Sequence, residues 1–132
     1  MTMISYTFAQ RFVPLISAGV MQQTFEPPRL RHARPGEPIR LMDKVNHRQI
    51  VEGAICTAVE RMDILWTGNR ITGIRESNMP LLRLEGCAKR LGYADLEDMA
   101  TDFARLHGPR YTEGYMIEWR IAATAALELE VA

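Results

Sequence analysis

Alternation of apolar and polar positions marks both ends of the regular part of this chain. Ile4–Phe8 alternates with the two-residue period of a strand, and Tyr115–Ile121 does so again. In the second run Ile117 and Trp119 share one side with Tyr115 and Ile121, and the other side has Met116, Glu118 and Arg120. We therefore expect a strand near each end, and the later one should be buried.

A helical spacing follows the first strand. From Ala9 onward, Phe12, Leu15 and Ile16 fall on one face of a helix, and Gly19 stands where a helix-ending glycine is expected. Pro14 lies near enough to the start to be tolerated in the first turn. The pattern predicts a short helix that ends at Gly19.

The central part of the chain reads as strands separated by turns. The two consecutive prolines at 27 and 28 remove backbone donors and predict a loop over residues 26–35. Gly53 is interpreted as a bulge within a longer strand. The predicted strands are Met21–Phe25, Ile39–Met42, Gln49–Met62 and two short strands within Ile64–Ile71 that are joined by a Gly-Asn turn.

Two helices are predicted before the last strand. Leu84–Leu91 should be short and end before Gly92. Asp95 resembles an N-cap and Asp98 the returning carboxylate of a capping box. The helix that follows should end at Gly108-Pro109, with one apolar face formed by Leu96, Met99, Phe103 and Leu106.

Strands outnumber helices and do not alternate with them, which argues against a parallel βαβ array. We expect an α+β fold, a curled and mostly antiparallel sheet or small β-barrel with two or three helices. The length of 132 residues is typical of one domain over residues 1–132, with a core over about 4–121. The tail at 122–132 could extend as a helix or fray.

Composition narrows the class of protein. The chain lacks an apolar run long enough to cross a bilayer and has no signal-peptide pattern at its start, so we expect a cytoplasmic protein that does not bind membranes. Cys56 and Cys87 have no metal-binding or disulfide spacing, and the three histidines are scattered. We expect two reduced thiols, no metal and no cofactor.

The charge is balanced overall but unevenly distributed. Lys plus Arg and Asp plus Glu each number 16. Between Arg29 and Arg48, however, six basic residues stand against two acids. One six-residue stretch of the predicted loop contains four cationic or titratable residues, Arg29, Arg31, His32 and Arg34. This density favours contact with phosphate.

Several short motifs, in this order, resemble the ASCH domain family, whose fold is a PUA-like β-barrel. The resemblance extends from about Ser5 to Trp119. It rests on Gln10-Arg11-Phe12, Ala18-Gly19, Gln23-Thr24, Arg34-Pro35-Gly36, Gly92-Tyr93, His107-Gly108 and Gly114-Tyr115-Met116-Ile117-Glu118-Trp119.

The resemblance implies a cleft for RNA or a nucleotide beside a Gly-x-Lys-x-x-Thr-x-Arg signature. In this chain the signature begins at Gly19, keeps Thr24, and has Met21 and Glu26 in place of its lysine and arginine. Some family members are amidohydrolases that act on 4-acetylcytidine and also use a glutamate, whose position here corresponds to Leu91. The resemblance therefore implies the cleft, with most of the catalytic groups replaced.

Another acid could replace the missing base. Glu26 lies two residues from Thr24 and would project to the same side of a strand, within reach of its hydroxyl. Asp95 is a further acid, although its position favours helix capping. The aromatic residues Tyr6, Phe8, Trp66 and Trp119 could stack on bases, but their spacing favours the core.

These observations lead to three hypotheses. The first is an ASCH-type module that binds RNA or a nucleotide without hydrolysis, through Gly19, Met21, Thr24, Arg29, Arg31, His32 and Arg34. The second is an amidohydrolase of the 4-acetylcytidine type with Thr24 as nucleophile and Glu26 as base. The third is a structural or accessory protein whose barrel serves an oligomer interface. Sequence alone does not predict the oligomeric state.

Overall fold

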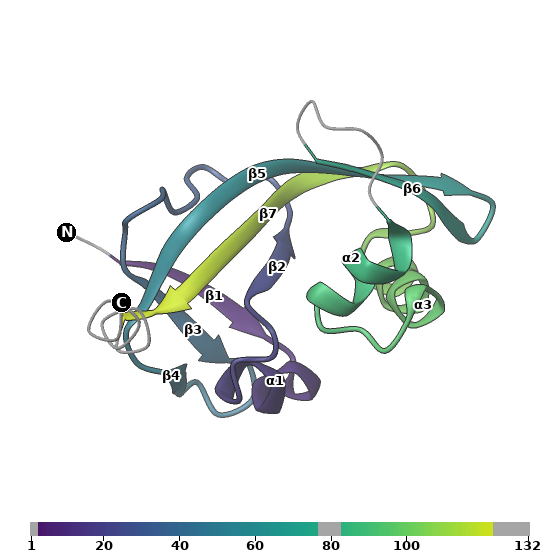
Figure 1. Cartoon of the computed structure of the whole chain (residues 1–132). Helices are drawn as coiled ribbons and strands as arrows, with labels where there is room; N and C mark the ends of the chain where they lie inside the picture. The colour runs from purple at the N-terminus through teal and green to yellow at the C-terminus, as the bar shows by residue number, and fades with distance from the viewer. Residues whose placement is uncertain (1–2, 77–82, 123–132) are drawn as a thin grey trace. The chain divides into compact units, whose positions relative to one another are not determined.

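The computed structural model describes residues 3–76 and 83–122, with an α+β arrangement of strands and helices (Figure 1). The short 3-10 segment η1 precedes the first helix. The elements in chain order are β1 (Ile4–Phe8), η1 (Gln10–Phe12), α1 (Val13–Ser17), β2 (Gln23–Glu26), β3 (Ile39–Asp43), β4 (Gln49–Val51), β5 (Ala54–Thr67), β6 (Arg70–Glu76), α2 (Leu84–Arg90), α3 (Leu96–His107) and β7 (Thr112–Ile121). The α+β prediction is confirmed.

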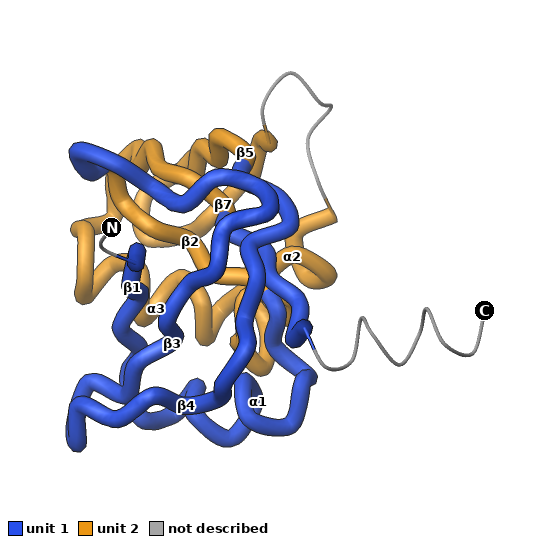
Figure 2. The backbone as a smooth tube through the Cα atoms, turned by 90° about the vertical axis from the view of Figure 1, so that its left-hand side faces the viewer, with its two compact units in different colours: residues 1–22, 29–59, 117–132 blue, residues 23–28, 60–116 orange. Residues whose placement is uncertain are grey.

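The chain divides into two compact units (Figure 2). Among the described residues, unit 1 contains 3–22, 29–59 and 117–122, and unit 2 contains 23–28, 60–76 and 83–116. Strands β5 and β7 each pass from one unit to the other, so neither unit is a continuous stretch of chain. The single domain over residues 1–132 stays a prediction.

The strands form two sheets, of order β1-β3-β4 and β2-β7-β5-β6. Pairs β3–β4 and β5–β6 are antiparallel, as expected, but β1 and β3 run parallel, with Tyr6 opposite Leu41. Parallel neighbours need a long connection, which residues 9–38 provide. No closed barrel is found among the described strands, so the PUA-like barrel stays a prediction.

The first helical segment ends where the sequence predicts. It is split into η1 and α1, and Pro14 lies in the first turn of α1. Gly19 adopts φ of 76°, a left-handed conformation that costs glycine little, and Met21 N–H donates to the Leu15 carbonyl. Phe12 and Ile16 are buried, which confirms the apolar face.

The prediction of one continuous strand over Gln49–Met62 is wrong, because the structure has two strands there, β4 and β5. Gly53 adopts φ of 78°, outside the range of pleated strands, and lies between β4 and β5. β5 then continues to Thr67 and turns through Gly68-Asn69 into β6. The predicted Gly-Asn turn is confirmed, but the first of its two strands is the end of the long β5.

Helices α2 and α3 pack against each other and against β6 within unit 2 (Figure 1). The capping prediction for α3 is confirmed, because the Asp95 carboxylate accepts a hydrogen bond from Asp98 N–H at 2.8 Å. The Asp98 carboxylate accepts from Ala94 N–H at 3.0 Å, one residue before the expected partner. α3 ends at Gly108, as predicted.

Strand β7 departs from strict alternation at its centre. Ile117 and Trp119 are buried as expected, but Met116, predicted on the opposite side, is only 3% exposed. Met116 belongs to unit 2 and Ile117 to unit 1, so consecutive residues contribute to different cores. The predicted helix or frayed end at 122–132 lies almost wholly outside the described residues.

Both thiols are buried, Cys56 at 0% and Cys87 at 1% exposure, as predicted for reduced core cysteines. Burial raises the pKa of Cys56 and raises the pKa of Cys87 to about 11. At pH 8 a pKa near 11 leaves about one Cys87 thiolate in a thousand.

We therefore expect the native protein to resist DTNB at pH 8 and the protein in guanidinium chloride to react at both thiols. Release of thionitrobenzoate measures the difference. Rapid reaction of either thiol in the folded protein would contradict the described burial.

In the described part of the chain, no helix combines the length and the apolar character that crossing a membrane requires.

Candidate functional site

The stretch from Gly19 to Gly36 is divided between the two units. Gly19, Met21 and residues 29–36 belong to unit 1, whereas Thr24 and Glu26 lie on β2 in unit 2. The two parts are therefore described separately. That they border one cleft stays a prediction.

Thr24 and Glu26 form a hydrogen-bonded pair on β2. Thr24 Oγ1 donates to Glu26 Oε2 at 3.0 Å, and Thr24 is only 7% exposed. The two side chains project to the same side because strand residues two apart share a face. The expectation that Glu26 lies within reach of the Thr24 hydroxyl is confirmed.

Phe25, between them in sequence, holds β2 within unit 2. Its ring lies 5.2 Å from the Phe103 ring and 5.9 Å from the His107 ring, both on α3. Burial lowers the pKa of His107, and the nearby Asp102 partly opposes this shift. Desolvation therefore favours the neutral imidazole, and the aromatic contacts give the Thr24–Glu26 pair a fixed backbone.

Two further positions that the resemblance singles out, Met21 and Leu91, are apolar and buried. Met21 is 2% exposed, so its thioether offers no surface to a ligand in this conformation. Leu91, at the position of the family's glutamate, is 3% exposed and is the C-cap of α2. Gly19 is exposed and serves as the turn after α1.

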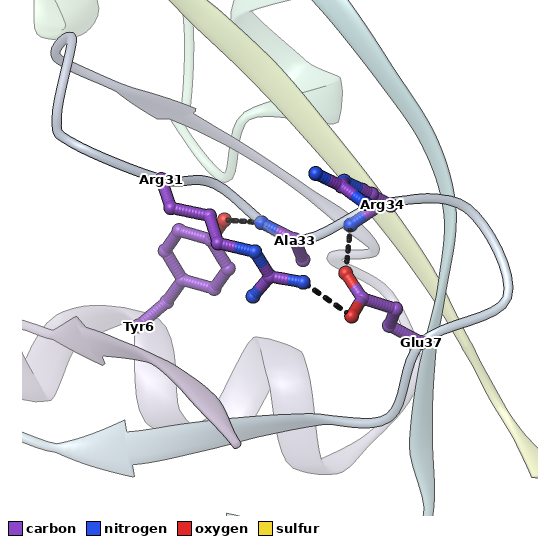
Figure 3. A network of polar contacts seen from close by, with 5 residues as sticks. All are labelled: Tyr6, Arg31, Ala33, Arg34 and Glu37. Atoms are coloured by element: carbon purple, nitrogen blue, oxygen red, sulfur yellow. Dashed lines mark hydrogen bonds and ion pairs between the residues drawn. The ribbon is translucent and has the colours of Figure 1, made fainter. Parts of the chain in front are cut away.

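The arginine loop, defined here as residues Arg29–Arg34, is anchored on Tyr6 of β1. Tyr6 is 1% exposed, and its hydroxyl oxygen accepts a hydrogen bond from Ala33 N–H at 3.1 Å (Figure 3). The same hydroxyl lies 3.0 Å from His32 Nδ1, and the two rings are stacked. Since the oxygen accepts from Ala33, its own proton is left to donate to Nδ1 in the tautomer that has the ring proton on Nε2.

Arg29 covers the outer side of this anchor. Its guanidinium lies 5.3 Å from the centre of the Tyr6 ring and donates to the Ser5 carbonyl at 3.2 Å. Cation–π contact and the hydrogen bond hold the start of the loop against β1. The Arg29 guanidinium is therefore partly engaged in contacts within the protein.

Glu37 closes the other end of the loop. Its carboxylate accepts from the Arg31 guanidinium at 2.5 Å and from Arg34 N–H at 2.6 Å (Figure 3). The adjoining backbone is paired with β5, since Gly36 N–H donates to the Cys56 carbonyl and Cys56 N–H to the Glu37 carbonyl. Tyr6 and Glu37 together order a loop that has no regular secondary structure.

The hydrogen bond from Arg31 is the main reason that the pKa of Glu37 lies below its usual 4.5, and the bond from Arg34 N–H adds to it. A lowered folded-state pKa stabilises the loop above the unfolded pKa, and this stabilisation is lost as the pH falls through the folded value.

We therefore expect the Arg34 amide resonance to shift, and its protection from hydrogen exchange relative to the intrinsic rate to fall, only below pH 4.5 in an NMR titration. Glu37→Gln keeps a carbonyl acceptor but does not titrate, so it should remove the acid-dependent change. The same transition in Glu37→Gln would show that another group is responsible.

Among the described residues, the Arg34 side chain makes no hydrogen bond or ion pair, although its charge helps to lower the pKa of Glu37. It is exposed, and Figure 3 shows it directed away from the Glu37 carboxylate. Leu30 is fully exposed as well. The loop thus offers one guanidinium without a hydrogen bond and one apolar side chain, while Arg29 and Arg31 are hydrogen-bonded.

The two units differ in net charge. Over its described residues, unit 1 has eight Lys and Arg against four Asp and Glu, a net charge of +4. The described residues of unit 2 have eight against ten, a net charge of −2. The unit that carries the arginine loop is therefore the one suited to an anion.

Two residues of this site are missed by sequence reasoning. Tyr6 is expected only as a core aromatic, and Glu37 only as part of a turn, yet they anchor the two ends of the loop. The spacing of 26 residues between Tyr6 and His32 leaves no local signal. The short separation of Glu37 from Arg34 was the only available indication.

Within residues 3–76 and 83–122, no group of three or more His, Cys, Asp or Glu side chains is placed to hold a metal ion.

Comparison with protein-family models, curated proteins and solved structures finds no match to this chain. The ASCH resemblance therefore stays a prediction, and function must be argued from the geometry.

Proposed function

We propose that unit 1 binds single-stranded RNA or a nucleotide phosphate through the arginine loop. The observation that supports this most is an ordered loop, fixed by Tyr6 and Glu37, that leaves the Arg34 guanidinium exposed on a unit of net charge +4. A loop ordered in advance loses less conformational entropy when it binds.

The contacts of the loop divide the expected roles among its arginines. Arg34 makes the principal phosphate contact, since its guanidinium makes no described hydrogen bond or ion pair. Arg31 contributes less, because a phosphate must compete with Glu37 for its guanidinium. Arg29 mainly positions the loop through Tyr6.

Fluorescence anisotropy with a labelled single-stranded RNA at low and moderate salt tests the proposal. We expect binding that weakens with salt. Arg34→Ala should lower the affinity, and it should also reduce the slope of log K against log salt concentration by about 0.7 for each lost phosphate contact. Arg75→Ala, an exposed arginine of β6 in unit 2, is the control of equal charge. Absence of binding at both salt concentrations, or an equal loss in Arg75→Ala, would refute the proposal.

A second function, amidohydrolysis, is favoured by the 3.0 Å hydrogen bond from Thr24 Oγ1 to Glu26 Oε2. In this scheme Thr24 Oγ1 attacks the acetyl carbonyl of 4-acetylcytidine while Glu26 takes the hydroxyl proton. Glu26 returns the proton to the departing amino group, and water then hydrolyses the acetyl-threonine ester to acetate. The pair supplies a nucleophile and a base.

An assay of 4-acetylcytidine deacetylation tests this second function, with the loss of substrate measured by chromatography. Thr24→Val keeps the shape of the side chain and should abolish turnover, as should Glu26→Gln, while Thr24→Ser should retain some. No turnover by the parent protein, or equal turnover by Thr24→Val, would exclude the enzyme.

A further inference from the structure

Unit 2 contains a hollow of about 710 Å³ that the proposed functions do not use. The β5–β6 turn supplies one wall, through Asn69, Arg70 and the start of β6, and the exposed side of α3 supplies the other. Its size falls in the range of small-molecule sites.

The floor of the hollow is apolar. Ile71 of β6 and Ala100 of α3 are 3% and 9% exposed, and Leu96 and Ala104 of α3 are half-buried beside them. Small side chains at positions 100 and 104, one helical turn apart, leave space over this side of α3. An apolar group of a ligand would be buried there.

Two opposite charges border the hollow without neutralising each other. Arg70 and Glu97 are exposed, and among the described residues neither side chain makes an ion pair or a hydrogen bond. Glu85, the other acid of the hollow, accepts a hydrogen bond from Leu96 N–H at 3.1 Å and is thus partly engaged.

An uncommitted cation and an uncommitted anion on the rim of one apolar hollow complement a ligand that carries both charges. Arg70 can bind a carboxylate through two N–H groups, and Glu97 can accept from an ammonium group. The Asn69 amide can add a donor or an acceptor at the turn. The volume exceeds that of a single amino acid.

We propose that this hollow binds a small apolar zwitterion of the size of a di- or tripeptide. Its carboxylate pairs with Arg70, its ammonium group pairs with Glu97, and its apolar side chains lie on Ile71 and Ala100.

Isothermal titration calorimetry with leucyl-leucine tests the proposal. We expect binding to the parent protein, and Arg70→Gln and Glu97→Gln should each raise the dissociation constant by about tenfold or more through loss of a charge-assisted pair. N-acetyl-leucyl-leucinamide has the same side chains without the charges and should bind at least about tenfold more weakly.

Arg75→Gln on β6 and Glu52→Gln after β4 are exposed positions outside the hollow and serve as matched controls for folding and charge. They should leave the affinity unchanged. No heat of binding with leucyl-leucine, equal affinity for the blocked peptide, or equal weakening by the controls would each overturn the proposal. None of these outcomes depends on RNA binding by unit 1.

Discussion

Gly114→Ala should destabilise the protein by about 3 kcal/mol, because the space for a side chain at this position in β7 is already filled. A Cβ atom on Gly114 would lie 2.5 Å from the Glu26 carbonyl oxygen and 2.5 Å from Phe25 Cζ. Neither can move freely, since Glu26 belongs to β2 and Phe25 packs on Phe103. Urea unfolding measured by circular dichroism gives the change in free energy.

The same substitution at Gly86 in α2 is the control and should have the opposite sign. There the nearest atom to the new Cβ is the flexible Arg90 guanidinium, at 3.5 Å. Alanine in place of glycine inside a helix stabilises it by about 0.5–1 kcal/mol. Equal stability changes in the two variants would contradict the close approach of β2 to Gly114.

Tyr6→Phe should destabilise the protein by about 1–3 kcal/mol, the typical cost of leaving a buried donor without a partner. The variant keeps the buried ring but removes the oxygen that accepts from Ala33 N–H, and Ala33 is only 2% exposed. It also removes the hydroxyl beside His32. Urea unfolding measures the cost, and faster exchange of the Ala33 amide should accompany it.

Tyr111→Phe is the matched control, since Tyr111 is 53% exposed and water can replace contacts of its hydroxyl. It should change stability by less than about 0.5 kcal/mol. If Tyr6→Phe has no larger effect than Tyr111→Phe, Tyr6 does not anchor the arginine loop. If Tyr6→Phe also weakens RNA binding while Arg34 is intact, loop order contributes to affinity.

Local elements of the fold follow from local chemistry. The α3 cap at Asp95 and the glycines that end α1 and α3 are predicted correctly because each depends on residues within one or two turns. Gly53 shows the limit of this reasoning. A bulge and a break between strands have the same sequence signal, and pairing partners elsewhere in the chain decide between them.

The site shows a similar division. The Thr24–Glu26 contact is predicted from strand geometry, because residues two apart share a face. The hydrogen bond between Arg31 and Glu37 and the cation–π contact between Arg29 and Tyr6 are not predicted from the sequence. Side-chain pairing in an irregular loop depends on the folded path of the loop. Counting the four cationic or titratable residues among residues 29–34 therefore overestimates the charge that is available to a ligand.

The sequence by itself determined the α+β class, most strand and helix positions, the buried thiols, and the concentration of basic residues after Arg29, since all of these depend on composition and short periodicity. Only the tertiary structure decided that Tyr6 and Glu37 hold the arginine loop, that Met21 is buried, and that Arg70 and Glu97 border one hollow. These outcomes depend on contacts between residues far apart in the chain, which no local pattern encodes.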